Sequence, residues 1–355
     1  MDLDDLTRFR SLDPDRMLDR IDGLPEQIET AWNLGRKLPL PPSLATARQV
    51  IVAGVGGSAI GGSLLEAYTA SRSRVPLSVW RNYGLPAWAA GEDTLVLAIS
   101  YSGETEETLS AFRAALDRRI PVLAITSGGT LAHLAAKQNG ASLWQFDFQA
   151  QPRAALGYLF ALPLCLFSRL GWIPDPQEEI AQALTALRTQ QASLRAEVPA
   201  VRNPAKRMAG QWIGRFVAIF ASDLLAPVAR RWRTQVAEVA KAWGQFEELP
   251  ELDHNAIAGS RFPEELIDRF RLVFLRSSFD HPRNRLRSEF TRELLMEEGF
   301  NTDEFSAAGD SPLSQMLTAV HFGDYTSYYL AMGYAVNPTP VQVIQDLKAR
   351  LAANP

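Results

Sequence analysis

Three loops rich in glycine and hydroxyl side chains each follow an apolar stretch of the chain. They span residues 54–62 (GVGGSAIGG), 100–105 (SYSGET) and 126–130 (TSGGT). Glycine allows tight turns and a close approach of the backbone to a ligand, and free amides at a helix start favour an anion. If each loop ends a parallel strand, the three meet at one edge of a sheet. The pattern therefore predicts a crevice for an anionic small molecule.

The first loop also fits a dinucleotide fingerprint. Gly54, Gly56 and Ala59 satisfy the pattern G-x-G-x-x-[GA]. A dinucleotide site should add an acidic residue about 20 positions further on, at the end of the second strand. That strand end reads VWRNYG, with Arg81 and no carboxylate. The spacing therefore favours a phosphate group over a dinucleotide, although a tight strand-to-helix turn without a ligand gives the same sequence.

The second loop places three hydroxyl groups at one helix start. Ser100, Ser102 and Thr105 surround Gly103 and precede the helical sequence EETL. A hydroxyl donates a hydrogen bond to a phosphate oxygen without adding charge. The same atoms can cap the helix instead, and the residues alone leave that alternative open.

Acid–base candidates lie in the second half of the chain. A carboxylate such as Glu238 can move a proton between neighbouring carbons if its pKa is raised toward neutrality. Glu238 and Lys241 also form an ordinary helix pair on a solvated face. Two histidines, His254 and His281, fall in polar turns where an imidazole could accept and donate protons. The neighbouring sequence does not show which of the two histidines is the acid–base group.

Arg153 is a candidate for stabilising negative charge. It follows the strand ASLWQFDF and precedes the apolar helical sequence of residues 154–167. A cation is electrostatically disfavoured at a helix amino terminus. Arg153 therefore either extends to solvent or faces the crevice.

Strands and helices alternate along the chain, which predicts an α/β fold with parallel sheets. One or two amphipathic helices occupy the first forty residues, with Pro14 at a first helical position and Pro25 at a break. A long polar helix is expected over residues 178–197, another over 224–243 and a further one near 284–298; two helices flank VNPTPV in the tail. The strands of the first half are QVIVAGV, PLSVW, TLVLAIS, IPVLAIT and ASLWQFDF; those of the second are RFVAIFAS and RLVFLRSS.

Length and composition set the class of protein. The 355 residues exceed what one core usually supports, and we expect two domains, residues 1–173 and 174–355. A formal charge of −4 gives no basic excess for nucleic acid or an anionic membrane. The apolar run of residues 154–167 is shorter than a bilayer requires and is expected as a buried helix. A single cysteine, Cys165, and an amino terminus without an apolar leader predict a cytoplasmic protein.

The order of these motifs resembles a known family. GVGGSAIGG, SYSGETEET and ITSGGTLA are similar to the motif series of sugar isomerase (SIS) domains, which bind phosphosugars. RWRTQVAEVAKA, ELDHNAIAG, PRAALGYLF and NPTPVQVIQDLK resemble the bifunctional phosphoglucose/phosphomannose isomerases of the phosphoglucose isomerase superfamily. The resemblance implies two tandem αβα SIS domains, each with a mainly parallel sheet, and helices at both ends of the chain. It also implies a homodimer that needs neither a metal nor another cofactor.

The same resemblance implies a role for individual residues. Glu238 matches the family's enediolate base, although the family commonly has Asn on both sides where this chain has Ala237 and Val239. Arg153 would stabilise the enediolate, and His254, donated by the neighbouring subunit, would open the sugar ring with Lys348. The phosphate and the sugar would be held by the remaining matched positions: Gly56, Gly57, Ser58, Ser100, Ser102, Thr105 and Thr339.

The expected activity is the interconversion of glucose 6-phosphate and mannose 6-phosphate with fructose 6-phosphate. Two alternatives remain open at this point. One is an SIS isomerase that acts on another sugar phosphate. The other is a sensor that binds phosphosugars without turning them over, since the flanks of Glu238 differ from the family pattern.

Overall fold

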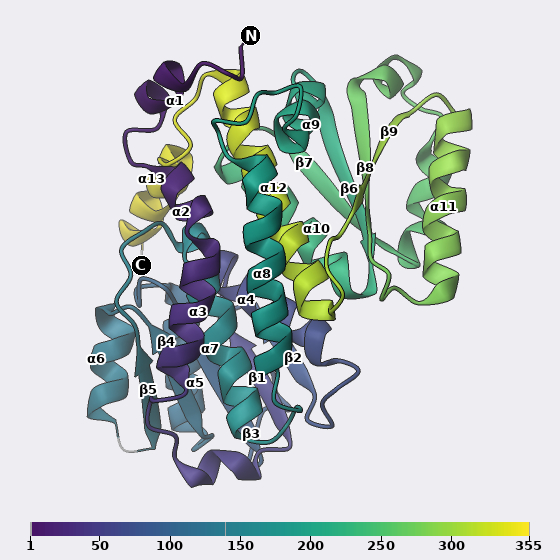
Figure 1. The fold of residues 1–355 in the computed structure, drawn as a ribbon. Coiled ribbons are helices and arrows are strands. Elements are labelled where there is room, and N and C mark those ends of the chain that lie inside the picture. Colours follow the sequence, from purple (N-terminus) through teal and green to yellow (C-terminus); the bar gives the residue numbers. More distant parts are fainter. Residues whose placement is uncertain (1, 139, 355) are drawn as a thin grey trace.

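The computed structural model describes residues 2–138 and 140–354. It has two lobes, each built on a parallel sheet (Figure 1). The first sheet has the order β2-β1-β3-β4-β5, which confirms the five strands expected for the first half. Its strands are β1 (Gln49–Ala53), β2 (Leu77–Trp80), β3 (Thr94–Ile99), β4 (Val122–Thr126) and β5 (Ala141–Gln145).

Helices cover both faces of the first sheet. Val50 and Val52 of β1 face α4 and α7, whereas Ile51 and Ala53 face α5 and α6, as the two-residue period of a strand requires. Continuous apolar sequence is typical of a strand buried on both sides. These helices are α4 (Gly56–Thr69), α5 (Glu106–Asp117), α6 (Gly129–Lys137) and α7 (Leu156–Arg169).

The second sheet has the order β7-β6-β8-β9, again parallel. The two expected strands, β6 (Phe216–Ser222) and β8 (Phe270–Arg276), form its centre. The sequence analysis missed the edge strands β7 (Gly244–Leu249) and β9 (Asn301–Ser306), because their polar sequences GQFEEL and NTDEFS resemble loops. Its helices are α10 (Ala226–Glu238), α11 (Pro282–Glu297) and α12 (Pro312–Tyr334).

The helix expected over residues 224–243 is shorter than predicted. A short 3₁₀ turn, η3 (Asp223–Leu225), precedes α10, and α10 ends at Glu238. Lys241 adopts a left-handed φ of 57°, which interrupts the helix before β7 begins. The candidate base therefore lies at the end of a helix rather than on its middle turns.

The first forty residues form three helices instead of the one or two expected, and Pro14 differs from its prediction. Pro14 lies in the turn between α1 (Leu6–Leu12) and α2 (Met17–Asp22), where the Asp13 carboxylate accepts the Met17 amide at 2.8 Å. Pro25 belongs to the first turn of α3 (Leu24–Gly35), where its missing N–H costs nothing. Because α2 ends at Asp22 and α3 starts at Leu24, Pro25 marks a break between two helices, as predicted.

A continuous apolar core joins the two lobes. It combines the α4 and α7 side of the first sheet with the α10 and α12 side of the second. As predicted, α7 is buried, and α12 is buried along nearly its whole length. The long helix expected near residues 178–197 is α8 (Gln177–Leu194), followed by α9 (Pro204–Trp212). The predicted division between residues 173 and 174 falls between α7 and α8 and stays a prediction.

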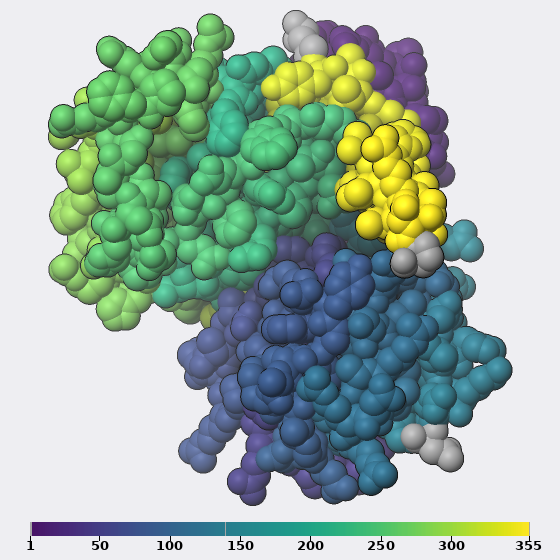
Figure 2. Space-filling view, turned by 180° about the vertical axis from the view of Figure 1, so that it is seen from behind, coloured from purple at the N-terminus to yellow at the C-terminus, as the bar shows by residue number. Residues whose placement is uncertain are grey.

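The carboxyl-terminal helix α13 (Gln342–Ala352) differs from every other long helix, since it buries none of its residues. It lies on the surface beside the junction of the two lobes (Figure 2). Among residues 2–138 and 140–354, no helix is long and apolar enough to cross a membrane.

Candidate functional site

The glycine and hydroxyl loops lie together at the carboxyl edge of the first sheet, as predicted. Ser58, in the first turn of α4, accepts a hydrogen bond from the Tyr101 amide at 3.2 Å. The Ser100 hydroxyl lies 2.9 Å from the Thr105 hydroxyl and accepts the Gly103 amide at 3.1 Å. Ser102 is exposed, and its hydroxyl accepts the Glu104 amide at 3.2 Å. The hydroxyl oxygens thus order the loops by accepting backbone amides, and hydroxyl protons such as those of Ser58 and Ser102 remain to be donated to an anion.

Two of these loops touch backbone to backbone. Gly103 has a φ of 72°, and a Cβ atom there would lie 2.0 Å from the Gly128 carbonyl oxygen. The Glu104 carboxylate accepts the Thr130 amide at 2.7 Å and the Thr130 hydroxyl at 2.8 Å. Only glycine fits at position 103, which keeps the second and third loops in one rigid unit.

The first loop also lies against the segment that carries Arg153. A Cβ atom on Gly57 would lie 2.9 Å from the Pro152 carbonyl oxygen. Pro152 and Arg153 belong to the short turn η2 (Pro152–Ala154), which precedes α7. Gly56, with a φ of 56°, allows the chain to turn into α4 directly beside this segment.

Arg153 faces the junction of the lobes instead of solvent. Its side chain is only 3% exposed, and its Nη1 atom lies 3.5 Å from Glu238 Oε2. Its Nη2 atom donates to the carbonyl oxygens of Pro338 at 2.8 Å and Thr339 at 2.5 Å. Burial lowers the pKa of Arg153 from its ordinary value, while the Glu238 carboxylate opposes that shift. Arg153 thus connects the two lobes at the point where Glu238 lies.

Glu238, the last residue of α10, keeps 26% of its side chain exposed. Among the residues that the structure describes, Arg153 is the one cationic side chain within ion-pair distance of its carboxylate. Of its two neighbours, Ala237 is exposed and Val239 is fully buried in the apolar core. The carboxylate therefore faces one cation and has an open side from which a small molecule can approach.

Behind this pair lies a buried ionic network that the sequence analysis did not identify. Arg231, on α10, donates from Nε and Nη2 to the Asp324 carboxylate at 3.0 and 2.6 Å. Gln235 donates to the same carboxylate at 3.0 Å. Arg231 Nη2 also donates to the backbone carbonyl of Arg153 at 3.1 Å. Arg153 is thus held through its backbone by Arg231 and through its side chain by Glu238, two residues on one helix.

Lys241 is a second site residue that the sequence analysis treated only as a helix partner of Glu238. Its Nζ atom donates to the Glu238 carbonyl at 2.5 Å and lies 3.4 Å from the Pro338 carbonyl. Desolvation lowers the pKa of Lys241 to about 8, with Arg153 acting in the same direction and Glu238 in the opposite one. The left-handed backbone that ends α10 is what brings this ammonium group back to the site.

Thr339 is buried beside these cations. It is 8% exposed, and its amide donates to the Asn337 side chain at 2.9 Å. Its hydroxyl is buried and has no hydrogen-bond partner among residues 2–138 and 140–354. Since a buried hydroxyl without a partner is costly, this atom marks a position where a polar ligand group would be favourable.

Two predicted site residues lie apart from the rest within one chain. His254 is exposed on the short turn η4 (Glu251–His254), and Lys348 is exposed on α13. Within the described parts of the chain, neither is joined to Arg153, Glu238 or Thr339 by a hydrogen bond or ion pair. Within the described residues of one chain, His254 is therefore not joined to the site formed by Arg153, Glu238 and Thr339.

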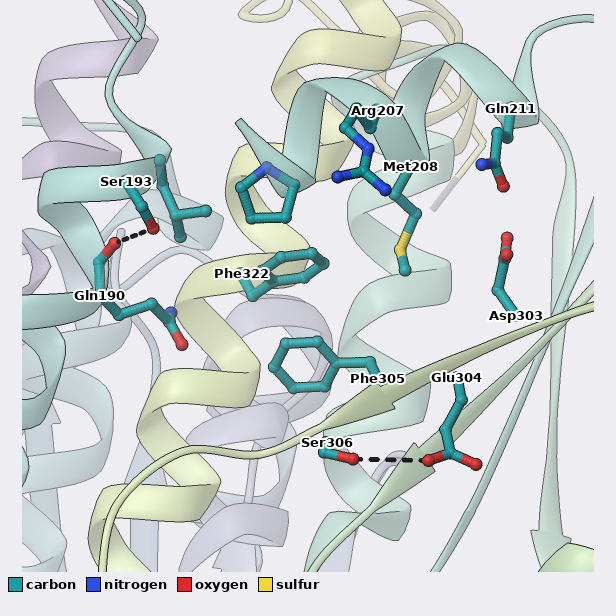
Figure 3. A pocket seen from close by; sticks show the side chains of 12 residues that line it. Gln190, Ser193, Arg207, Met208, Gln211, Asp303, Glu304, Phe305, Ser306 and Phe322 are labelled. Carbon is teal, nitrogen blue, oxygen red and sulfur yellow. Dashed lines mark hydrogen bonds between the residues drawn. The ribbon is translucent and has the colours of Figure 1, made fainter. Parts of the chain in front are cut away.

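The hollow in Figure 3 is separate from this site. It lies between α8, α9, β9 and α12, and Arg207, Asp303 and Phe322 are among its lining residues. None of the predicted site residues lines it. No group of three His, Cys, Asp or Glu residues within 2–138 and 140–354 is arranged to hold a metal ion.

Comparisons with known proteins agree with this architecture. Residues 43–137 match the model of the SIS domain, and residues 201–351 match that of the bacterial phospho-glucose isomerase C-terminal SIS domain. A bifunctional phosphoglucose/phosphomannose isomerase of Caldicellulosiruptor bescii is 36% identical over 95% of this chain and 99% of its own. Its namesake from Aquifex aeolicus is 33% identical over 91% and 97% of the two chains. The crystal structure of a hypothetical protein from Thermus thermophilus shares the fold, with a TM-score of 0.73, 18% identity and coverage of 98% and 94%.

Proposed function

Because the chain belongs to the family of bifunctional phosphoglucose/phosphomannose isomerases, we propose that it interconverts glucose 6-phosphate and mannose 6-phosphate with fructose 6-phosphate. The two aldoses differ from each other only in the configuration at C2, the carbon that loses its proton. A planar enediolate is therefore common to both reactions. Rotation about the C2–C3 bond of that intermediate would present either face to one base.

Glu238 is the base in this proposal. Its carboxylate takes the C2 proton of the open-chain aldose, the electron pair of that C–H bond forms the C1–C2 double bond of the enediolate, and the π electrons of the C1 carbonyl move onto O1. The proton of the C2 hydroxyl passes to O1, and the same carboxyl group returns its proton to C1 as the C2 carbonyl forms, which gives the ketose. In support, Glu238 lies at a helix end with an open side, next to a guanidinium group at 3.5 Å.

Arg153 stabilises the enediolate oxygen. A fixed positive charge in a sheltered site is often the largest catalytic contribution, worth roughly 3–4 kcal/mol per donor. Arg153 is buried and fixed by contacts on both its backbone and its side chain, which supports this role. Thr339, whose buried hydroxyl has no partner within the described residues, would bind a sugar hydroxyl near C4.

The phosphate is held by the loops of the first lobe. Ser58, Ser100, Ser102 and Thr105 supply hydroxyl groups, and the amides near Gly56 and Gly57 supply further donors at the start of α4. Binding of this remote group positions the sugar carbons against Glu238. Backbone contact between Gly57 and the Arg153 segment fixes the distance from phosphate site to reacting carbons.

Ring opening requires a second subunit. His254 and Lys348 are the proposed acid–base groups, and both are exposed and separate from Glu238 within one chain. A homodimer in which the partner supplies His254 would complete the site. Exposure of the whole of α13 supports such an arrangement, since a helix of this length is marginal in water without a surface to cover it. The cytoplasmic location expected from the sequence belongs to the same proposal.

The ion pair between Arg153 and Glu238 at the phosphate-loop edge is the observation that carries the proposal. The purified protein should convert mannose 6-phosphate to fructose 6-phosphate, detected by a coupled assay, in the presence of a chelator. Loss of activity with chelator would contradict the metal-free route. Binding of mannose 6-phosphate without turnover would instead identify a sensor, and turnover of a different sugar phosphate alone would identify another SIS isomerase.

A further inference from the structure

Lys241 is the second cation of the site, and the proposed mechanism gives it no chemical step. Its Nζ atom donates to the backbone carbonyl oxygens of Glu238 and Pro338. An ammonium group has three N–H donors, and within residues 2–138 and 140–354 the third one has no acceptor. The residue is exposed, so a small molecule can reach this third donor.

Lys241 and Arg153 approach the same carbonyl oxygen. Arg153 Nη2 donates to the Pro338 oxygen at 2.8 Å, and Lys241 Nζ lies 3.4 Å from that oxygen. Arg153 Nη1 in turn lies 3.5 Å from Glu238 Oε2. The ammonium, the guanidinium and the carboxylate are therefore neighbours. A sugar whose C1 and C2 lie against Glu238 would present O1 and O2 to the two cations.

Conversion of an aldose to a ketose moves protons on oxygen as well as on carbon. In the proposed reaction Glu238 carries the proton between C2 and C1. One proton must also leave O2 and one must reach O1 before the ketose forms. The group that performs this transfer has to give a proton and take one near neutral pH.

Lys241 meets this requirement, whereas Arg153 does not. A guanidinium group is not deprotonated in proteins, so Arg153 can stabilise charge but cannot carry a proton. The charged groups that act on Lys241 are Arg153, which lowers its pKa, and Glu238, which raises it. Together with partial desolvation they bring the pKa of Lys241 to about 8. An amine with this pKa is present in both protonation states near neutral pH.

We propose that Lys241 is a catalytic residue that transfers the proton between O2 and O1 of the enediolate, a role that rests on the proposed function. Starting from the aldose, the Lys241 ammonium gives a proton to the O1 oxyanion, and the resulting amine takes the proton of the O2 hydroxyl. The electron pair of that O–H bond stays on O2 and forms the C2 carbonyl. The C1–C2 π electrons then take the proton from the Glu238 carboxyl group. Lys241 ends as an ammonium and Glu238 as a carboxylate, as both began.

Hydrogen exchange in deuterated water separates the Lys241 step from the Glu238 step. Starting from fructose 6-phosphate, Glu238 removes a C1 hydrogen and can return deuterium to the same carbon without any transfer between O1 and O2. Deuterium at C1 of fructose 6-phosphate, followed by NMR, therefore measures formation of the enediolate. Glucose 6-phosphate and mannose 6-phosphate, measured in the same samples, report the complete reaction.

Lys241→Arg keeps the positive charge but removes the group that can release a proton. Isomerisation should fall by roughly 10²-fold, whereas exchange at C1 should stay within about threefold of wild type. Because exchange requires an intact site, it also shows that the variant is folded. Lys37→Arg, at an exposed position outside the site, is the matched control and should change neither rate.

Chemical rescue supplies an independent test on Lys241→Ala. Added ethylamine should restore part of the isomerisation, because a free amine can give and take a proton. Added guanidinium ion supplies only charge and should not restore it. Equal effects of the two cations would show that charge alone matters and would overturn the proposal.

The exchange experiment also distinguishes failure of this proposal from failure of the proposed function. Equal losses of exchange and isomerisation in Lys241→Arg would overturn the proton transfer by Lys241, because the lysine would then serve formation of the enediolate. Unchanged isomerisation in that variant would overturn it as well. In both cases an active wild-type protein leaves the proposed function standing. A wild-type protein that neither exchanges nor isomerises fructose 6-phosphate would refute the function and the role of Lys241 together.

Discussion

Arg153 and Glu238 meet across the two lobes, and a single helix fixes both partners of this contact. Glu238 ends α10, and its Oε2 atom lies 3.5 Å from Arg153 Nη1. Arg231, two turns earlier on the same helix, donates to the Arg153 carbonyl oxygen at 3.1 Å. The spacing of cation and carboxylate is therefore set by the geometry of α10 and does not rely on a flexible loop.

Glu238→Gln should abolish isomerisation while the protein still binds phosphosugars. The amide keeps the size of the side chain but cannot accept the C2 proton, so kcat should fall by roughly 10²- to 10⁴-fold. Stopped assays with mannose 6-phosphate and calorimetric titration with the same sugar would separate the two effects. Glu265→Gln, at an exposed position outside the site, is the matched control. Retention of full turnover in Glu238→Gln would remove this residue from the mechanism.

Arg231→Met should reduce both stability and turnover. Removing one partner of a buried ion pair costs roughly 3–5 kcal/mol of the free energy of unfolding. In Arg231→Met/Asp324→Leu the unpaired carboxylate is also removed, so part of that stability should return. Turnover should stay low, on the order of 10²-fold below wild type, because the Arg153 carbonyl still lacks its donor.

Urea unfolding and kcat measured on the same preparations would show whether the double variant regains stability while its turnover stays low. Unchanged KM for fructose 6-phosphate would indicate that the phosphate loops remain intact. If the double variant regained stability and turnover together, Arg231 would have no positioning role.

Turnover should fall on the alkaline side as Lys241 loses its proton. Burial lowers the pKa of Lys241 to about 8 from an ordinary 10.5. Above pH 8 the neutral amine no longer adds positive charge beside Arg153 and Glu238, so kcat/KM should decline there. Lys241→Arg should move that decline to higher pH, because the guanidinium stays protonated. Identical pH–rate profiles for the two proteins would show that Lys241 does not control this limb.

The lowered pKa of Lys241 should raise the stability of the folded protein as the pH rises, whereas it lowers turnover. Between pH 8 and 10.5 the unfolded chain binds the Lys241 proton more tightly than the folded protein does. This residue's contribution to the free energy of unfolding should therefore rise with pH across that window. Urea unfolding at pH 7.5 and 9.5 gives the change in the free energy of unfolding with pH for each protein. The contribution of Lys241 is the difference between that change in wild type and in Lys241→Met.

The sequence predicted those parts of the fold that follow from local patterns. Buried strands such as β1 and β3 are continuous apolar runs, and the hydroxyl loops follow them directly. The edge strands of the second sheet, unlike those of the first, were missed because they carry polar residues such as Glu247 in β7 and Asp303 in β9. The family was identified correctly because the order of its motifs is specific.

The contacts inside the site could not be predicted in the same way. Arg231 donates to Arg153 only because α10 packs against α4 of the other lobe, beside η2, and no local pattern encodes that packing. Lys241 was expected within a helix, where its side chain would point to solvent, but its left-handed backbone directs it toward Glu238. Spacing along the sequence identifies candidate residues, whereas tertiary packing decides which of them meet.

Gly103→Ala should weaken phosphate binding more than Gly84→Ala does, although both glycines have a positive φ. Position 103 combines a φ of 72° with a Cβ position 2.0 Å from the Gly128 carbonyl oxygen, so the second and third loops must separate. Gly84→Ala is the control, because Gly84 has a φ of 60° but no atom within 4 Å of its Cβ position. Both variants should lose about 1 kcal/mol or more of stability from the left-handed backbone. Gly103→Ala should in addition raise the KM for fructose 6-phosphate and weaken inhibition by inorganic phosphate. Equal KM values in the two variants would show that contact between the loops is not needed to hold the phosphate.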